Sequence, residues 1–527
     1  MSLVSVEGSS LTSLHLADVF ADAVALGAER PFLIAGGRRL TYAQVDREAQ
    51  VFAAALSDLG IAAGDRIATV LPNRPEAVTA LLAAARLGAT LVPVNPALAY
   101  HELSFQLRHA GVSAVVAIES WQDRDYLEWF DELVAEIPEI RHVIAVGGED
   151  VWYEDRVVGY ADLLARGAHG HVKGAARDPE SLIALLYTSG TLGKPKGVCL
   201  SHRSVMGNAA RTAAALGVRQ DDVSLLAVPH FTIFGTSLIA GAITAGASLV
   251  LVETFSAAEA VARMAEEGVT LCHGVPTMFA LLLRERGFSR ERLGRLRTGI
   301  VAGSPVEAGL VRAVRAVCEV EIAYGLTETG PTVTMTRAAD PAELRETTVG
   351  RALPGVELRL LEPGDGAAAE LAVKGPGVMA GYDRMPSETR RAFTEDGFFR
   401  TGDLATVDAD GYVRIAGRRK ESIIRGGFNV HPREVEEVLR AHPAVEDVCV
   451  VGVPHEVLGE MICACIVPTE GAIVRSGDLI AYAREAMADY KVPDLVCRFD
   501  AFPLSASGKV KRRELARMVA EELTAST

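Results

Sequence analysis

The first third of the chain alternates two hydrophobic patterns. Residues 40–60 and 76–88 place apolar side chains at helical spacing, and Gly60 closes the first of these stretches as a helix C-cap. Short apolar runs predict buried strands at residues 66–72, 89–95, 112–118 and 141–147. This alternation of strand and helix predicts parallel sheets that are covered by helices.

Two further stretches of the N-terminal part differ from this rhythm. Residues 228–252 contain no Asp, Glu, Lys or Arg, but they include Pro229, His230 and several glycines. We therefore expect a buried helix followed by a strand at residues 247–252, and not a membrane span. The polar, mixed stretch of residues 151–179 is expected to be a surface connection.

From Glu357 onward the pattern changes to short apolar runs between the turn signals PGDG and KGPG, which predicts antiparallel strands. Residues 411–454 then indicate strand, strand, helix and strand. Pro432 suits the first position of that helix, and its apolar face consists of Val435, Val438 and Leu439.

These patterns predict an α/β large N-terminal domain, with helix-covered sheets and a β-rich subdomain, followed by a small α+β C-terminal domain. We place the large domain at residues 1–417, a hinge at residues 418–420 and the small domain at residues 421–527. A length of 527 residues agrees with more than one domain.

Charge and cysteine content narrow the class of protein. The net charge of −15 argues against nucleic acid as a partner. The seven cysteines are scattered and odd in number, and strand alternation puts Cys463 and Cys465 on one face, so we expect reduced core thiols. The first lysine or arginine is Arg30, which predicts no signal peptide and a cytoplasmic protein.

The stretch YTSGTLGKPKG, residues 187–197, follows the apolar run of residues 182–186. Its glycines, hydroxyls and lysines suit an anion such as phosphate, although the stretch does not match the P-loop pattern. Lysines are few in this arginine-rich chain, and Lys194 and Lys196 both lie in this loop. Lysine is the compact, flexible cation that arginine replaces poorly at a phosphate.

Four more motifs follow in order: AYGLTETGP (residues 323–331), GFFRTGDLA (397–405), GRRKESIIRGGFNVHPREVE (417–436) and PLSASGKVKRREL (503–515). Together with the loop, they resemble the adenylate-forming superfamily of acyl-CoA synthetases, peptide-synthetase adenylation domains and firefly luciferase. The resemblance covers nearly the whole chain and is strongest to a free-standing fatty acyl-CoA synthetase.

The resemblance implies a two-step ligase that uses ATP, Mg²⁺ and CoA. A carboxylate attacks the α-phosphate of ATP to give acyl-AMP and pyrophosphate, and the CoA thiol then displaces AMP. The small domain is expected to be mobile and to rotate between the steps about the hinge residue Lys420.

The resemblance also implies roles for residues of each motif. Three are expected to act in catalysis: Lys509, which bridges carboxylate and α-phosphate, Thr327, which contacts the α-phosphate, and Glu328, which binds Mg²⁺. The expected phosphate-binding residues are Thr188, Ser189, Gly190, Thr191 and Lys196. Leu192 stands where the family usually has a hydroxyl, which puts one pyrophosphate contact in doubt.

The remaining implied residues surround AMP and the thiol. The nucleoside is expected to contact Tyr324 by stacking, Asp403 through the ribose hydroxyls and Arg418 at ribose or phosphate, with Gly303, Ser304 and Gly325 close by. Gly426 and Gly427 are expected to line the thiol tunnel, because glycine allows close backbone approach.

His230, Phe231 and Thr232 are expected at the acyl pocket. Thr232 replaces the aspartate that amino-acid-activating members show, so amino acids are unfavoured substrates, and it also replaces a histidine of acyl and aryl members. We favour a medium- or long-chain fatty acid. The alternatives are an aryl acid such as benzoate or cinnamate, and a degenerate regulatory nucleotide-binding protein. A homodimer is a further possibility that the sequence leaves open.

Overall fold

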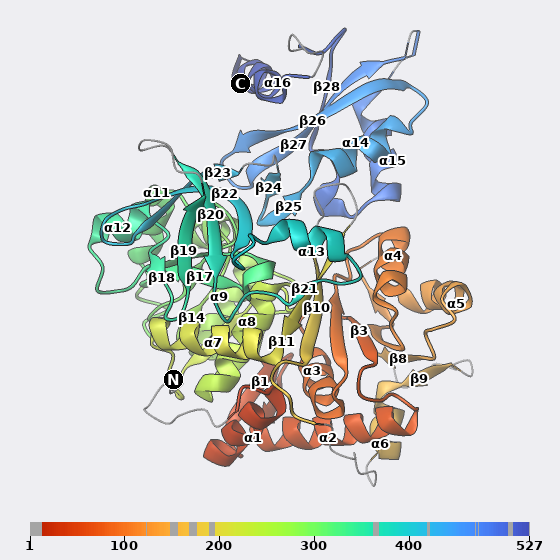
Figure 1. The fold of residues 1–527 in the computed structure, drawn as a ribbon, viewed down its shortest axis with the longest axis vertical. Coiled ribbons are helices and arrows are strands. Elements are labelled where there is room, and N and C mark those ends of the chain that lie inside the picture. The colour runs from red at the N-terminus through yellow and green to blue at the C-terminus, as the bar shows by residue number, and fades with distance from the viewer. Residues whose placement is uncertain are drawn as a thin grey trace.

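The computed structural model describes residues 13–122, 124–147, 156–167, 176–188, 195–361, 368–418, 422–469, 471–472, 474–503 and 510–525. The chain folds into a large domain and a small C-terminal domain, which lies at one end of the long axis (Figure 1). The fold class predicted from the sequence is confirmed. Of the predicted hinge, residues 418–420, only Arg418 is described, so that boundary stays a prediction.

An eight-stranded mixed sheet forms the centre of the large domain. Its order is β21 (Gly381–Tyr382), β11 (Lys196–Ser201), β10 (Leu182–Thr188), β4 (Thr90–Val94), β3 (Arg66–Val70), β5 (Ala114–Ile118), β8 (His142–Val146) and β9 (Val157–Gly159). The strands from β10 to β9 pair in parallel, as predicted, because helices connect them. The hairpin of β10 and β11 and the added strand β21 are antiparallel.

A second sheet lies beside the first and carries the apolar stretch. Its order is β14 (Leu271–Cys272), β12 (Val223–Leu226), β13 (Ser248–Leu251), β1 (Pro31–Ala35) and β2 (Arg38–Thr41). The charge-free stretch forms α8 (Ile233–Ala245) and then β13, so the predicted buried helix and strand are confirmed. In the part of the chain that the structure describes, no helix is both long and apolar enough to cross a membrane.

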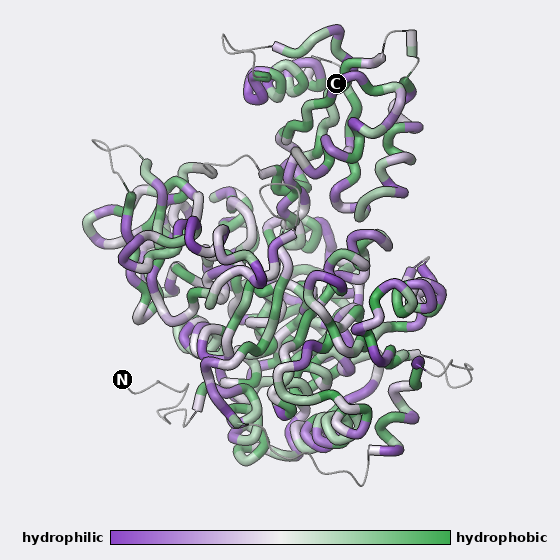
Figure 2. Tube along the Cα trace, turned by 45° about the vertical axis from the view of Figure 1, so that its right-hand side comes forward, coloured by the Kyte–Doolittle hydropathy of each residue, from purple (hydrophilic) through white to green (hydrophobic). Residues whose placement is uncertain are grey.

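Helices cover these sheets on the outside (Figure 1). They include α1 (Leu16–Gly27), α2 (Tyr42–Asp58), α3 (Pro75–Leu87), α4 (Tyr100–Ala110), α5 (Tyr126–Glu136), α6 (Tyr160–Gly167), α7 (His202–Leu216), α9 (Ala257–Glu266) and α10 (Pro276–Arg284). The tube is hydrophobic along the central strands and more hydrophilic on outer segments (Figure 2). Burial of this apolar surface is the main driving force for the large domain.

The prediction of a surface connection at residues 151–179 is wrong for part of that stretch. Residues 157–167 form β9 and α6. Tyr160 and Leu163 are buried, and the Tyr160 hydroxyl donates to Glu48 Oε1 at 2.8 Å. These few inward-facing residues anchor α6 against α2, although the stretch as a whole is polar.

Two smaller sheets complete the large domain. One has the order β15 (Ile300–Val301), β16 (Glu321–Gly325), β17 (Thr332–Met335) and β18 (Arg351–Ala352). The other contains β19 (Glu357–Leu361), β20 (Ala369–Lys374), β22 (Phe399–Val407) and β23 (Val413–Arg418), all antiparallel as predicted. The predicted PGDG turn lies outside the described residues. The helices here are α11 (Ala308–Arg315), α12 (Ala342–Thr347) and α13 (Pro386–Ala392).

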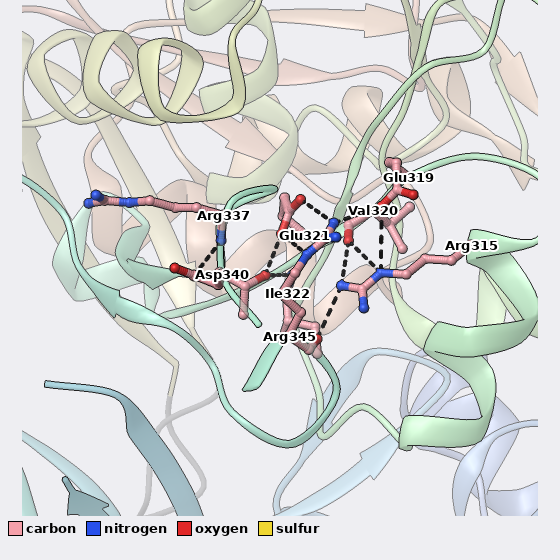
Figure 3. Close-up of polar contacts among 9 residues, drawn as sticks. Arg315, Glu319, Val320, Glu321, Ile322, Arg337, Asp340 and Arg345 are labelled. Atoms are coloured by element: carbon pink, nitrogen blue, oxygen red, sulfur yellow. Dashed lines mark hydrogen bonds and ion pairs between the residues drawn. The ribbon is translucent and has the colours of Figure 1, made fainter. Parts of the chain in front are cut away.

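An ion network anchors the start of β16 (Figure 3). Arg345 Nη2 lies 2.7 Å from Glu321 Oε1 and 2.7 Å from Glu319 Oε2, and Thr336 Oγ1 donates to Glu321 Oε2 at 2.7 Å. Arg315 Nη2 donates to the Val320 carbonyl at 3.1 Å. These contacts fix the strand whose other end carries Tyr324, Gly325 and the residues that follow them.

The small domain is built on one sheet and three helices within its described residues. The strands run β25 (Phe428–Val430), β24 (Ile423–Arg425), β27 (Gly459–Pro468) and β26 (Val445–His455), with β28 (Leu495–Arg498) beside β27. The helices are α14 (Pro432–Arg440), α15 (Ser476–Ala486) and α16 (Arg512–Ala525). The predicted helix start at Pro432 is confirmed. Cys463 and Cys465 lie in one core cluster, and the described cysteines are free thiols.

A buried charge cluster joins the two domains. Lys491 Nζ, on the short helix η2 (Asp489–Lys491), lies 2.5 Å from Glu102 Oε1 of the large domain and 2.5 Å from Glu434 Oε1 of the small domain. The Ala488 N–H donates to Glu102 Oε2 at 3.0 Å. Lys491 is only 3% exposed, and its neighbouring negative charges raise its pKa despite burial. The small domain is thus held against α4 by ionic contacts that water scarcely reaches.

Candidate active site

The described ends of the predicted phosphate loop belong to the antiparallel strands β10 and β11. Thr188, the last residue of β10, pairs with Lys196, the first residue of β11. Both side chains are half-buried, so part of each faces solvent. Three predicted residues of the loop, Ser189, Gly190 and Thr191, lie outside the described residues, as does Leu192.

Tyr382, which the sequence analysis did not predict as a site residue, contacts both Lys196 and the predicted metal-binding carboxylate of Glu328. Tyr382 lies on β21, opposite Val198 of β11. The Lys196 ammonium nitrogen is 4.5 Å from the centroid of the Tyr382 ring. The Tyr382 hydroxyl donates to Glu328 Oε1 at 2.8 Å. Burial and the nearby Glu328 charge raise the Tyr382 pKa, so the phenol is a stable donor.

Glu328 lies in η1 (Thr327–Thr329), a single short turn directly after β16. Thr327 and Glu328 are half-buried. Gly325 is required at the preceding bend, because a Cβ there would lie 1.7 Å from the Pro331 carbonyl oxygen. In this turn the Glu328 side chain accepts from the Tyr382 hydroxyl, and the Met379 N–H donates to the Glu328 carbonyl at 2.9 Å.

Two predicted nucleoside-binding residues contact each other. The Tyr324 hydroxyl donates to Asp403 Oδ2 at 2.7 Å. Asp403 lies on β22, is 3% exposed, and its N–H donates to Thr401 Oγ1 at 3.1 Å. Arg418 is the Cα partner of Asp403 across the β22–β23 ladder, which places the two residues side by side at the backbone level. The bond orients the tyrosine ring and leaves the ring itself half-buried.

Of the two predicted thiol-tunnel glycines, Gly427 reaches the large domain at Val275, the residue before α10. Gly427 has φ +86°, and a Cβ there would lie 2.8 Å from Val275 Cγ1. Gly303 of the large domain has φ +92°, and its Cβ would lie 3.1 Å from the same methyl carbon. The Val275 side chain therefore packs between a loop of the small domain and the half-buried Ser304 region of the predicted AMP site.

The Gly-Gly loop is held from the small-domain side. Arg425, directly before Gly426, makes a bidentate pair with Asp494, with Nη2–Oδ1 at 2.6 Å and Nε–Oδ2 at 2.8 Å. The Gly426 N–H donates to the Leu458 carbonyl at 2.8 Å. A bidentate arginine–carboxylate pair fixes orientation as well as distance. Lys420 and Lys509, the predicted hinge and adenylation lysines, lie outside the described residues.

The residues predicted for the acyl pocket lie directly before α8. His230 is 4% exposed, both its ring nitrogens lack a partner among the described residues, and burial lowers its pKa to about 4. Thr232 caps α8: its Oγ1 accepts from the Gly235 N–H at 3.1 Å and donates to the Pro229 carbonyl at 2.8 Å. Phe231, half-buried, packs edge-on against His230.

A cavity of about 30 Å³ lies deeper, between α7, α8 and the strand ends, with room for about one water. It is lined by residues of both helices and by His273 and includes Phe234, Leu238, Gly241 and Ile300. His230, Phe231 and Thr232 are not among its lining residues. An acid would occupy this space only if the surrounding side chains moved apart.

Metal-binding groups are sparse in the site. Among the described residues, no cluster of three or more His, Cys, Asp or Glu side chains is arranged to hold a metal by itself. Glu328 offers one carboxylate. That donor set fits Mg²⁺ that arrives with ATP, because Mg²⁺ is commonly bound by one or two carboxylates together with substrate phosphates.

Comparisons with known proteins identify the family of the chain. The family model of the AMP-binding enzymes matches residues 20–383, and the model of the AMP-binding enzyme C-terminal domain matches residues 434–509. A Bacillus subtilis protein, YngI, assigned provisionally as an acyl-CoA synthetase, is 36% identical over 93% of this chain and 94% of its own length. The mitochondrial medium-chain acyl-CoA ligase ACSF2 of Bos taurus is 31% identical over 92% of this chain and 84% of its own.

A solved structure shows the same arrangement of both domains. The o-succinylbenzoate CoA synthetase MenE of Bacillus subtilis, a double mutant bound to a product analogue, superposes with a TM-score of 0.82 and 28% sequence identity. The match covers 95% of this chain and 98% of that one. The chain therefore belongs to the AMP-binding enzyme family, within the adenylate-forming superfamily, and is an enzyme of the acyl-CoA synthetase type.

Proposed function

We propose that this enzyme activates an apolar carboxylic acid as an acyl adenylate with release of pyrophosphate, and then transfers the acyl group to CoA. The observation that carries the proposal is the convergence of Lys196, Tyr382 and Glu328 beside the Tyr324–Asp403 pair. A cation and a carboxylate at one end, and an oriented tyrosine with a buried carboxylate at the other, suit a nucleoside triphosphate.

In the first step the triphosphate would lie beside Thr188 and Lys196. Lys196 and Thr188, together with the loop residues between them, would neutralise and hold the leaving pyrophosphate. Thr327 would donate to the α-phosphate, and Lys509 would bridge it to the attacking carboxylate. Asp403 would accept from the ribose hydroxyls while it orients Tyr324 against the adenine.

Mg²⁺ brought by ATP would supply a Lewis acid that neutralises phosphate charge. Glu328 would hold it with one carboxylate oxygen while the other accepts from Tyr382. In the second step, CoA would enter along the Gly426–Gly427 loop, where the Val275 contact leaves no room for a side chain on Gly427.

The acid itself is proposed from the polarity of the region. Burial lowers the pKa of His230 and of His273 to about 4, so both are neutral near pH 7. The Thr232 hydroxyl is engaged in capping α8. The α-ammonium of an amino acid would therefore be buried without a counter-charge from these three residues, at a cost of several kcal/mol. We favour a medium- or long-chain fatty acid, in line with the relative from Bos taurus.

An aryl acid is the second candidate, because the superposed synthetase acts on o-succinylbenzoate. Pyrophosphate release with ATP, Mg²⁺ and CoA should be measured for octanoate, dodecanoate, benzoate, cinnamate and phenylalanine. We expect kcat/KM to rise with chain length until the pocket ends, because each buried methylene should stabilise the bound acid by about 0.8 kcal/mol. Preference for the aromatic acids would support the second candidate, and fastest turnover of phenylalanine would refute the role given to Thr232.

The same assay decides between turnover and a purely regulatory nucleotide-binding role. A cytoplasmic location and a homodimer stay predictions; fractionation and sedimentation would test them.

A further inference from the structure

We propose that Tyr382 is a positioning residue that sets Glu328 and Lys196 relative to each other, so that the metal-binding carboxylate and the phosphate-binding ammonium act on one triphosphate. The proposal rests on the functions proposed above for Glu328 and Lys196. It is carried by two contacts of one side chain: a 2.8 Å hydrogen bond from the hydroxyl to Glu328 Oε1, and the Lys196 ammonium 4.5 Å from the ring centroid.

The three residues come from separate parts of the chain. Glu328 follows β16, Lys196 begins β11, and Tyr382 ends β21. Neither Glu328 nor Lys196 is near the other in sequence, so their relative placement depends on tertiary contacts. Tyr382 contacts both, and the pairing of β21 with β11 ties it directly to the strand that carries Lys196.

The backbone at Tyr382 is itself held in place, which limits the positions that its ring can take. Its backbone N–H donates to Thr389 Oγ1 of α13 at 2.9 Å. Gly381 has φ +148°, and a Cβ there would lie 2.9 Å from the Thr389 methyl carbon, so the chain approaches α13 closely at this point. The ring is half-buried. A fixed ring can therefore transmit its position to both charged groups.

The two contacts act on different properties of the charged groups. The hydroxyl donates to one carboxylate oxygen of Glu328 and so limits its rotation, which orients the other oxygen for a cation. The ring face attracts the Lys196 ammonium through its quadrupole and keeps the flexible lysine side chain over the hairpin. The hydroxyl and the ring are separable by mutation: Tyr382→Phe removes only the first contact, and Tyr382→Leu removes both.

The test measures equilibrium binding of ATP, without acid or CoA, in the presence and absence of Mg²⁺. We expect Tyr382→Phe to bind metal-free ATP with unchanged affinity. The factor by which Mg²⁺ tightens ATP binding should be about tenfold smaller in this variant than in the wild type, which corresponds to one hydrogen bond to a charged group. Tyr382→Leu should in addition bind metal-free ATP about threefold more weakly, because Lys196 loses its aromatic contact. Unchanged affinities in both variants would overturn the proposal.

A matched control exists in the same domain. The Tyr412 hydroxyl donates to Asp340 Oδ1 at 2.9 Å, and Arg351 lies over the Tyr412 ring at 4.9 Å, which is the same chemistry away from the cleft. Tyr412→Phe should leave both ATP affinities unchanged. If it lowers the Mg²⁺ gain as much as Tyr382→Phe does, the effect is general destabilisation and the proposal is wrong.

Glu328→Gln separates failure of this inference from failure of the proposed function. We expect it to lose nearly all of the Mg²⁺ gain. If Glu328→Gln keeps the gain, the metal-binding role is wrong and the inference falls with it. If Glu328→Gln loses the gain and Tyr382→Phe keeps it, the metal-binding role stands and only the positioning role of Tyr382 is refuted.

Discussion

The proposed nucleotide side of the cleft and the proposed thiol side are built from different domains. On the nucleotide side, the described contacts lie within the large domain: Tyr324 bonds to Asp403, and Tyr382 contacts Glu328 and Lys196. On the thiol side, Gly427 of the small domain meets Val275 of the large domain. The first side therefore keeps its geometry wherever the small domain lies, whereas the second exists only while the two domains are in contact.

Two ion clusters show the same contrast. The Arg345 cluster joins Glu319 and Glu321 inside the large domain and supports the strand that leads to Tyr324 (Figure 3). The Lys491 cluster joins Glu102 and Glu434 across the junction. Carboxylates bridged by a cation thus stabilise a fold in one place and an arrangement of domains in the other.

The largest expected effect comes from removing the cation at the junction. Lys491→Met leaves Glu102 and Glu434 facing each other in a buried site, and breaking a buried pair in this way costs about 3–5 kcal/mol. We expect the small domain to undock, so that thioester formation from supplied acyl-AMP falls while ATP binding persists. Limited proteolysis and the two half-reactions, measured separately, check this.

Arg345→Met is the matched variant within the large domain. It should lower the free energy of unfolding of that domain and reduce ATP binding, because β16 loses its anchor. If Lys491→Met and Arg345→Met change both half-reactions in the same proportion, the contrast between the two clusters is wrong.

Lys509 is the expected exception to the contrast, since it is a small-domain residue proposed to act on the nucleotide side. Lys509→Ala should slow acyl-adenylate formation by about 10²–10³-fold, the cost of one preorganised charge-stabilising group. Thioester formation from supplied acyl-AMP should largely survive. Equal loss in both half-reactions would instead indicate a structural role for Lys509.

Gly427→Leu tests the thiol side directly. The new side chain would meet Val275, and we expect the CoA step to fall by about 100-fold while acyl-adenylate formation continues. Gly411→Leu is the control: Gly411 has φ +84°, close to the +86° of Gly427, but open space surrounds its Cβ position. A loss of the CoA step in both variants would point to backbone strain and not to a blocked tunnel.

The sequence predicts the local parts of this arrangement better than the long-range ones. The strands and helices of the first third, the antiparallel strands after Glu357 and the start of α14 follow from periodicity and turn residues. Tyr382 was missed because β21 is only two residues long and pairs with β11, far away in the chain. Its only sequence signal was a tyrosine after a glycine at the end of the β-rich stretch.

One residue predicted for the acyl pocket has a local structural role. Thr232 fits its position as a helix cap, which its place directly before an apolar helix would have indicated. The Lys491 cluster could not be predicted, because Glu102, Glu434 and Lys491 are brought together only when the two domains dock.

The smallest expected effect is on the stability of the protein at low pH, and it arises in the large domain. His202, His230 and His273 are buried in the large domain, and burial lowers their pKa values to about 3, 4 and 4. The unfolded chain, with histidine pKa values near 6.5, binds protons that the folded domain does not, so stability is complete above pH 6.5 and falls as the pH drops toward 4. Each histidine should cost about 2 kcal/mol between pH 6.5 and 5.

Urea unfolding at pH 7.5, 6.5 and 5.0 measures this loss, and His230→Phe isolates one contribution. Because burial leaves the His230 ring neutral and both of its nitrogens lack a partner among the described residues, phenylalanine should be tolerated at pH 7.5. The variant should then lose about 2 kcal/mol less than the wild type on going to pH 5.0. His101→Phe, at an exposed position on α4, is the control and should follow the wild-type pH dependence. If His230→Phe loses as much stability as the wild type, protonation of His230 is not coupled to unfolding, and the acid sensitivity of the large domain has another origin.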